Sequence, residues 1–294
     1  MRRTASPHSE SPSDSSTLPV VVYTHRSRLR QPSVLLQEIW SDLRSSRELA
    51  WQLTYRKINV RYRQSLLGPL WAVIPPILAA LTSRVLQRSG VVDVGETEIP
   101  YPLYVMFATV LWQVFSRSLA MPLQAMKDGI QLLRTIQVPV EGLMLAGVGE
   151  LLFDQGIQIM VLIAVFIFAP VPITWGVIPA IGVLIMLMLL GISIGLFLVP
   201  FGSLYTDVSS ALPYLTRFWF FLTPILYPPP ERWPYSLLVE LNPVTPLLSG
   251  VIDLTTTGRL NNPVLFVVVS LCTVALFCVG WVIYRVAVPL LVER

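Results

Sequence analysis

The chain has 294 residues, of which 54% are hydrophobic and 13% are charged, and its mean hydropathy is +0.65. So few charged residues cannot cover the surface of a water-soluble protein of this length, which excludes a soluble globular enzyme. Residues 1–63 hold 11 of the 21 Lys and Arg residues but only five of the 17 acidic residues. The net charge of +4 therefore reports membrane topology and not nucleic-acid binding, and the composition predicts a polytopic membrane protein.

The N-terminal region precedes the apolar part of the chain. Residues 1–33 are rich in Ser and Pro, so we expect a disordered cytoplasmic tail, and no cleavable secretory signal is recognisable there. In residues 34–64, apolar positions recur at intervals of three and four, which predicts an amphipathic helix. Trp40 and Trp51 fall on or near its apolar side. We expect this helix to lie in the cytoplasmic membrane interface, with packing against a soluble partner as the alternative.

Residues 65–294 hold six sparsely charged segments, and we expect an all-α transmembrane domain there. Basic residues directly before the first segment, including Lys57 and Arg61, are retained on the cytoplasmic side of the membrane. Because six crossings return the chain to that side, both termini are predicted to be cytoplasmic. The predicted spans are residues 66–85, 101–122, 143–169, 176–200, 212–227 and 263–284.

Two further regions contain apolar segments too short to cross a membrane. In MKDGIQLLRTIQVPVEG, at 126–142, helical spacing of apolar residues predicts a short cytoplasmic helix bounded by Gly129 and Pro139. Residues 233–241 and 244–254 form two apolar stretches of only about ten residues each. They predict a re-entrant extracytoplasmic helix pair between spans five and six.

A membrane-embedded enzyme, such as a polytopic glycosyltransferase or an intramembrane protease, is an alternative function. Both histidines, His8 and His25, lie in the expected tail, which removes them from any Ser–His or His–metal site inside the membrane. Cys272 and Cys278 fall on different faces of the last predicted span, and their spacing suits neither a disulfide nor a metal site. We therefore expect no catalytic residue and no metal ligand in this chain.

Five segments occur in the order in which they occur in one known family. They are VRYRQSLLGPLWAVIPP, YPLYVMFATVLWQVFS, LLRTIQVPVE, LPYLTRFWFFLTPILYP, and ERW followed by LNPVTPLL. Each segment alone is weakly specific, whereas the five in sequence are a specific signal. From about residue 49 to its end, the chain resembles the membrane subunit of ABC-2 type polysaccharide exporters, which export lipid-linked O antigen, teichoic acid or capsule.

The resemblance implies a permease subunit that pairs with a second copy of itself and is driven by two separate ATPase subunits. ATP and Mg²⁺ would be bound by those partners, in agreement with the lack of a GxxxxGK[ST] phosphate loop in this sequence. The substrate would be a lipid-linked glycan, most similar to O antigen, carried across the inner membrane from the cytoplasmic side. An ABC-2 permease for a drug or a simple lipid is the nearer alternative.

The resemblance also implies roles for particular residues. In such exporters the short helix between spans two and three docks into the ATPase. Here this assigns the coupling to Asp128, Ile130, Leu133, Arg134, Ile136 and Pro139. Aromatic rings bind the apolar C–H faces of sugars weakly, as a channel for long glycans requires. The candidates for lining the channel are Tyr104, Trp112, Phe115, Phe218, Trp219, Phe221 and Tyr227, with lipid-facing positions as the alternative for each.

Glu150 and Asp154 lie four residues apart in the third predicted span and so share one face of the helix. Unpaired carboxylates inside a membrane are costly, so they need partners or water. Counting residues from the cytoplasmic ends places Glu150 at about the depth of Arg217, with Arg117 somewhat shallower. We expect Glu150 to pair with Arg217 or Arg117, within one subunit or across the dimer. Alternatively, Arg217 lines the channel and meets the pyrophosphate of the lipid-linked substrate.

Overall fold

The computed structural model describes residues 44–63, 65–66, 68–90, 99–135, 140–168, 174–227, 239 and 241–292. The expected tail and residues 34–43, with Trp40, lie outside this part of the chain. All described residues belong to one compact unit that comprises residues 41–294. Within the described ranges, every regular element is a helix, as the sequence predicts.

Five helices are long and apolar enough to cross a membrane, and they correspond to five of the six predicted spans. They cover Leu70–Arg88, Tyr101–Gly129, Val140–Phe168, Val177–Leu204 and Pro263–Val288. The remaining predicted span, 212–227, corresponds to α7 (Thr206–Leu222), which begins and ends earlier than predicted. Its 17 residues would extend only about 26 Å, slightly less than the hydrocarbon thickness.

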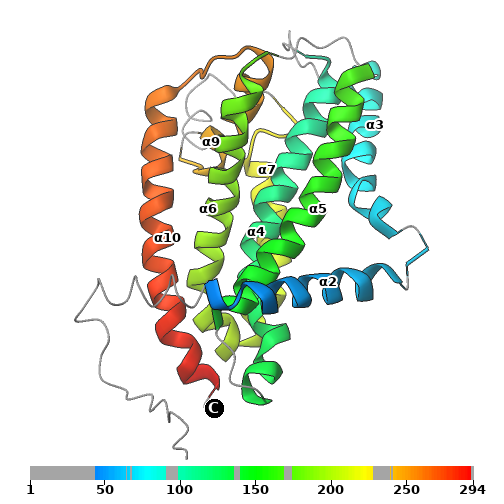
Figure 1. The fold of residues 1–294 in the computed structure, drawn as a ribbon. Coiled ribbons are helices and arrows are strands. Elements are labelled where there is room, and N and C mark those ends of the chain that lie inside the picture. Colours follow the sequence, from blue (N-terminus) through cyan, green and yellow to red (C-terminus); the bar gives the residue numbers. More distant parts are fainter. Residues whose placement is uncertain are drawn as a thin grey trace, which may run out of the picture. The chain divides into compact units, whose positions relative to one another are not determined.

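Helix α2 (Arg47–Arg63) crosses the spanning helices instead of running along them (Figure 1). It packs on α5 (Val140–Phe168) through Ala50 and Thr54, which are its buried residues. Trp51, expected on the apolar side of an amphipathic helix, is 71% exposed. The side of α2 that packs on α5 is thus not the side of Trp51: Leu49 and Thr54 lie against Gly142 and Gly149 of α5.

The first span is interrupted near its start. Gly68 has φ +50° and is the first residue of the 3-10 helix η2 (Gly68–Ala72), which precedes α3 (Ile74–Arg88). The sequence interpretation placed one helix over 66–85. Pro75 and Pro76 instead occupy the first turn of α3, where a missing N–H leaves no helical hydrogen bond unmade.

Helix α4 (Tyr101–Thr135) is one helix of 35 residues, whereas the sequence predicted a span ending at 122 and a separate short helix after it. Pro122 lies inside α4, and Gly129 does not end it. A Cβ at Gly129 would lie only 2.3 Å from Leu143 Cδ1, so this glycine permits α4 and α5 to approach each other. The sequence analysis predicts a helix boundary at Gly129, whereas in the structure Gly129 is a packing contact between α4 and α5.

Helix α6 (Val177–Leu204) contacts α4, α9 (Val244–Thr256) and α10 (Pro263–Val292). Its approach to α4 depends on two glycines. A Cβ on Gly191 would lie 2.7 Å from the Phe115 carbonyl oxygen, and one on Gly195 would lie 2.4 Å from that of Leu119. Two small residues four apart on one helix face bring the backbones of α4 and α6 together.

Helix α9 is a short apolar helix of 13 residues, most of them buried, against α6, α10 and α4. It covers the second of the two stretches predicted as a re-entrant pair. Of the first stretch, 233–241, only 239 and 241 are described.

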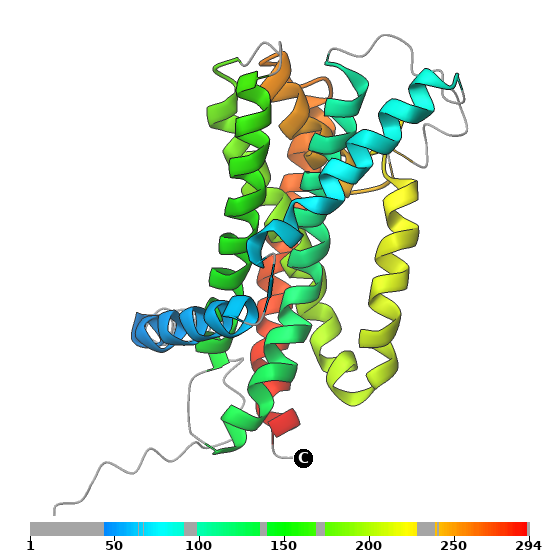
Figure 2. The same ribbon diagram turned by 90° about the vertical axis from the view of Figure 1, so that its right-hand side faces the viewer.

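The elements fall at two ends of the spanning helices. Helix α2, the start of α5, the turn between α6 and α7 and the end of α10 lie at one end, below in Figure 1, and the starts of α4, α6 and α10 lie at the other. Figure 2 shows α7, in yellow, standing beside the remaining helices. Side chains of α2, α4, α5 and α7 meet at the α2 end.

Candidate functional site

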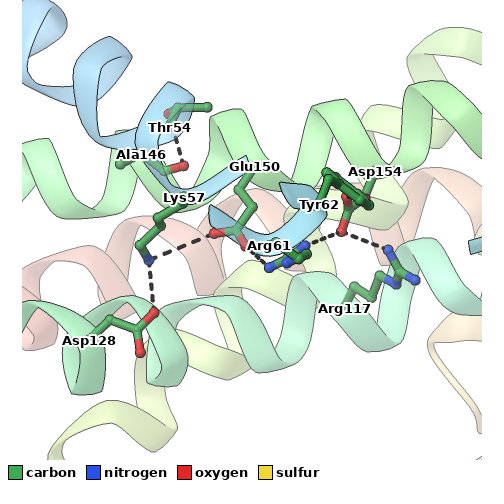
Figure 3. A network of polar contacts seen from close by, with 9 residues as sticks. All are labelled: Thr54, Lys57, Arg61, Tyr62, Arg117, Asp128, Ala146, Glu150 and Asp154. Carbon is green, nitrogen blue, oxygen red and sulfur yellow. Dashed lines mark hydrogen bonds and ion pairs between the residues drawn. The ribbon is translucent and has the colours of Figure 1, made fainter. Parts of the chain in front are cut away.

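Asp154 on α5 is the centre of a polar network that joins α2, α4 and α5 (Figure 3). Its Oδ2 accepts hydrogen bonds from Arg61 Nη1 at 2.8 Å and Arg117 Nη1 at 2.9 Å, and its Oδ1 accepts one from the Tyr62 hydroxyl at 2.9 Å. The Asp154 side chain is 10% exposed. Three donors from two helices thus compensate a carboxylate that water scarcely reaches.

Glu150, one helical turn before Asp154, forms ion pairs with Arg61 and with Lys57, whose Nζ lies 3.7 Å from Glu150 Oε2. Lys57 Nζ also donates to Asp128 Oδ2 on α4 at 2.9 Å. The pairing predicted for Glu150 within one subunit is therefore wrong in its partner. The cations come from α2 of the same chain, Arg117 pairs with Asp154 instead, and Arg217 makes no ion pair with the described residues.

Two features of α2 and α5 fix the position of the network. The Thr54 hydroxyl donates to the Ala146 carbonyl at 3.2 Å, and a Cβ on Gly149 would lie 2.6 Å from Thr54 Oγ1. This close contact places Lys57 and Arg61, one and two turns later on α2, over the acidic face of α5. Burial and the neighbouring Asp154 carboxylate raise the pKa of the Tyr62 phenol, which therefore donates as a neutral hydroxyl.

A cavity of about 700 Å³, here called the α4–α7 groove, lies against this network. Lys57, Arg61 and Glu150 border it on the side of α2 and α5, and Arg117 borders it from α4. Between α4 and α7 its lining mixes polar and small side chains with larger apolar ones: Ser116, Ala120, Gln124, Lys127, Ser209, Pro213 and Thr216, together with Met121, Leu123 and Leu212. Its four cations and three carboxylates leave an excess of one positive charge.

Aromatic rings join α4 to α7 one turn beyond the groove. Phe115 and Trp219 lie 5.2 Å apart between ring centroids, and Trp112 and Phe220 lie 5.8 Å apart. Trp112 is 6% exposed and Phe115 is fully buried. In this chain these rings fill the contact between α4 and α7.

A buried hydrogen-bond chain holds the end of α7 against α9. Trp219 Nε1 donates to Asn242 Oδ1 at 3.0 Å, and Asn242 Nδ2 donates to Thr223 Oγ1 at 2.8 Å. Asn242 Oδ1 also accepts from the Val244 amide at 3.1 Å. Asn242 therefore fixes the turn that leads into α9.

Replacing Trp219 with Phe should lower the free energy of unfolding by about 1 kcal/mol, because the ring contact with Phe115 remains while Asn242 loses one of two donors. Thermal unfolding of the purified chain in detergent measures the change. Tyr227→Phe is the matched control, since its hydroxyl donates to the Phe221 carbonyl in an exposed position. Equal effects of the two substitutions would contradict the structural role of Asn242.

The other channel candidates lie in different surroundings. The Tyr104 hydroxyl donates to the Pro224 carbonyl at 2.9 Å, which ties α4 to the end of α7. Phe218 and Phe221 are exposed on α7, and so is Arg217, which directly precedes Phe218. The structure thus brings Trp112, Phe115 and Trp219 together and leaves Arg217, Phe218 and Phe221 exposed.

The residues assigned to ATPase coupling lie at the end of α4. Asp128 is paired with Lys57, and the backbone of Ile130, Leu133 and Arg134 continues the same helix. Ile136 and Pro139 lie outside the described residues. The network therefore reaches directly into the end of α4.

Sequence reasoning missed Lys57, Arg61 and Tyr62 as members of the network. Lys57 and Arg61 were read only as a basic membrane flank, although their spacing of four residues matches that of Glu150 and Asp154. It also missed three glutamines. Gln158 Nε2 donates to Gln113 Oε1 at 2.7 Å and to the Ala72 carbonyl at 3.0 Å, and Gln155 Nε2 donates to the Gln113 carbonyl at 3.4 Å.

Comparison with known proteins agrees with this architecture. The family model of the ABC-2 type transporters matches residues 48–255, more than half of the chain. The chain is 26% identical over 214 residues to the O-antigen export system permease protein RfbA of Myxococcus xanthus, which covers 71% of this chain and 80% of that protein. It is also 26% identical over 221 residues to the protein of the same name from Klebsiella pneumoniae, with the same coverage.

Other relatives of this chain are named for polysialic acid transport rather than for O-antigen export. The chain is 21% identical over 253 residues to the polysialic acid transport protein KpsM of Escherichia coli, which covers 79% of this chain and 91% of that protein. The family match spans α2 through α9, and thus includes the network and both helices that line the groove. The chain therefore belongs to the ABC-2 type transporter family.

Proposed function

We propose that this chain is the permease subunit of an ATP-driven exporter that carries a lipid-linked polysaccharide from the cytoplasmic side across the inner membrane. The observation that carries the proposal is the α4–α7 groove at the α2 end of the spanning helices. The relatives named for O-antigen export and polysialic acid transport support a glycan as the substrate.

The lining of the groove suits sugars. Hydroxyl and amide groups are offered by Ser116, Gln124, Ser209 and Thr216. The small side chains of Ala120 and Pro213 leave space for a ligand. Hydroxyl-rich ligands exchange water for such groups without burying a strong charge. The side of the groove nearest the aromatic contact is closed by Trp112, Phe115 and Trp219, so passage of a glycan requires α7 to move away from α4.

The remaining parts of the assembly belong to the same proposal. α7 completes a six-span topology with both termini cytoplasmic, α2 lies in the membrane interface, and α9 belongs to a re-entrant pair. A second copy of the chain faces the exposed Phe218 and Phe221 on α7, which then line the path with Trp219 and Arg217. Two ATPase subunits bind ATP and Mg²⁺ and contact the end of α4, where Asp128 lies.

The test is export of surface glycan in the host. Deletion of the gene should remove long-chain glycan from the surface and cause lipid-linked polymer to accumulate inside, as seen on a gel beside a complemented strain. Ala120→Trp fills the groove and should fail to restore the surface glycan. Gly156→Trp is the matched control, because nothing lies within 4 Å of a Cβ at Gly156. Unchanged surface glycan after deletion, in a host with no second exporter, would favour a drug or simple lipid as substrate.

A further inference from the structure

Arg117 has unused hydrogen-bonding capacity toward the α4–α7 groove. A guanidinium carries five N–H donors, and among the described residues Arg117 uses one, from Nη1 to Asp154 Oδ2. Its side chain is 35% exposed and borders the groove. Its remaining donors are therefore available to a ligand that occupies the groove.

Asp154 does not depend on Arg117 alone. Its Oδ2 also accepts from Arg61 Nη1 and its Oδ1 from the Tyr62 hydroxyl, both on α2. If Arg117 turned toward a ligand, Asp154 would retain one guanidinium and one hydroxyl donor. Of the two arginines that pair with Asp154, Arg117 can therefore be released at a smaller electrostatic cost than Arg61, which also pairs with Glu150.

The surroundings indicate the class of ligand. Ser116 lies beside Arg117, Thr216 lines the groove from α7, and Lys127 lies ten residues further along α4. Lys127 Nζ donates to Ser209 Oγ at 2.5 Å and makes no ion pair with the described residues, so it supplies the excess positive charge of the groove. A planar guanidinium with hydroxyl groups at its side suits an oxygen-rich anion, above all a phosphate group.

We propose that Arg117 binds the phosphate group of the lipid-linked substrate when the substrate occupies the α4–α7 groove. The Arg117 guanidinium then leaves the Asp154 carboxylate and pairs with the phosphate instead. This assignment rests on the proposed function. Lys127, about 15 Å away along α4, attracts the anion toward the open part of the groove. The anion site is therefore on α4 and not at Arg217, which is exposed on α7 and does not border the groove.

The experiment measures binding of radiolabelled farnesyl pyrophosphate to the full-length chain in phosphatidylcholine nanodiscs. Arg117→Gln should weaken binding about tenfold or more, as expected when a charge-assisted hydrogen bond is lost. Arg117→Lys keeps the charge near Asp154 but loses the planar fork, and should weaken binding measurably while the chain stays folded. Tyr62→Phe is the matched control. This substitution also removes one hydrogen bond to Asp154, but the Tyr62 side chain does not border the groove.

Three outcomes would overturn the proposal. If both Arg117 variants bound farnesyl pyrophosphate with unchanged affinity, Arg117 would be only a structural partner of Asp154. The same conclusion would follow if Tyr62→Phe lost as much affinity as Arg117→Gln. Equally tight binding of inorganic pyrophosphate would assign the site to a free phosphate and remove the lipid-linked source. Because this titration reads binding alone, its failure is distinguishable from failure of the proposed export, which is read from surface glycan in the host.

Discussion

Replacement of Asp154 with Ala is expected to lower the free energy of unfolding by about 3 kcal/mol, the lower end of the range for removing one member of a buried charge pair. The substitution leaves Arg61 and Arg117, whose groups both lie within 3 Å of the same carboxylate oxygen, to face each other without an anion between them. Both arginines are partly exposed, so water offsets part of the loss.

Asp128→Ala is the matched control for this substitution. Asp128 is 58% exposed and, within the described part of the chain, forms an ion pair only with Lys57, whereas Asp154 is 10% exposed and has three partners. Because exposed ion pairs contribute little, we expect Asp128→Ala to cost less than about 1 kcal/mol. Thermal unfolding of both purified variants in the same detergent gives the comparison. Equal destabilisation would contradict Asp154 as the centre of the network.

Replacement of Gly195 with Ala is expected to destabilise the protein by about 3 kcal/mol, although Ala is the better helix former. The added Cβ would lie 2.4 Å from the Leu119 carbonyl oxygen and 2.9 Å from Pro122 Cδ. The obstacle is largely backbone and a proline ring, which cannot turn aside as a flexible side chain does. Helices α4 and α6 must move apart, and the packing around Leu196, which is fully buried, is lost with them.

Gly182, on the same helix, offers the opposite expectation. Nothing lies within 4 Å of a Cβ at Gly182, so Gly182→Ala should leave stability unchanged or raise it by up to about 1 kcal/mol. Size-exclusion chromatography of heated samples gives the melting temperature of each variant. We expect the melting temperature to fall for Gly195→Ala and to stay the same or rise for Gly182→Ala, so that the two differ by several degrees. A Gly195→Ala variant as stable as the unmodified chain would show that α4 and α6 can separate without cost.

Much of the fold follows from apolar segment length. Five of the predicted spans are recovered because hydrocarbon thickness fixes how many residues a helix needs. The ends of elements were less accurate. Gly129 and Pro122 are signals for helix ends in water, yet α4 continues through both because close packing on α5 and α6 stabilises it. Local propensity could not reveal that tertiary contact.

The site was predicted only in part. The sequence singled out Glu150, Asp154 and Arg117, since charges in a membrane need partners. Counting residues gives the depth of a side chain but not the direction it faces around the bundle, and Arg217 was chosen on depth alone. The true partners, Lys57 and Arg61, lie on α2, whose crossing over α5 depends on contacts such as Thr54 against Gly149. No periodicity in α2 encodes that contact.

The network of α2, α4 and α5 contains three cations, Lys57, Arg61 and Arg117, and three anions, Asp128, Glu150 and Asp154. A single charge that crosses a membrane potential of 100 mV gains or loses about 2.3 kcal/mol. When α2, α4 and α5 move as one body, these six side chains carry no net charge through this field. Such a joint movement performs no electrical work on the network, whereas a swing of α2 alone would carry the charges of Lys57 and Arg61 and should therefore differ in rate between energised and depolarised cells.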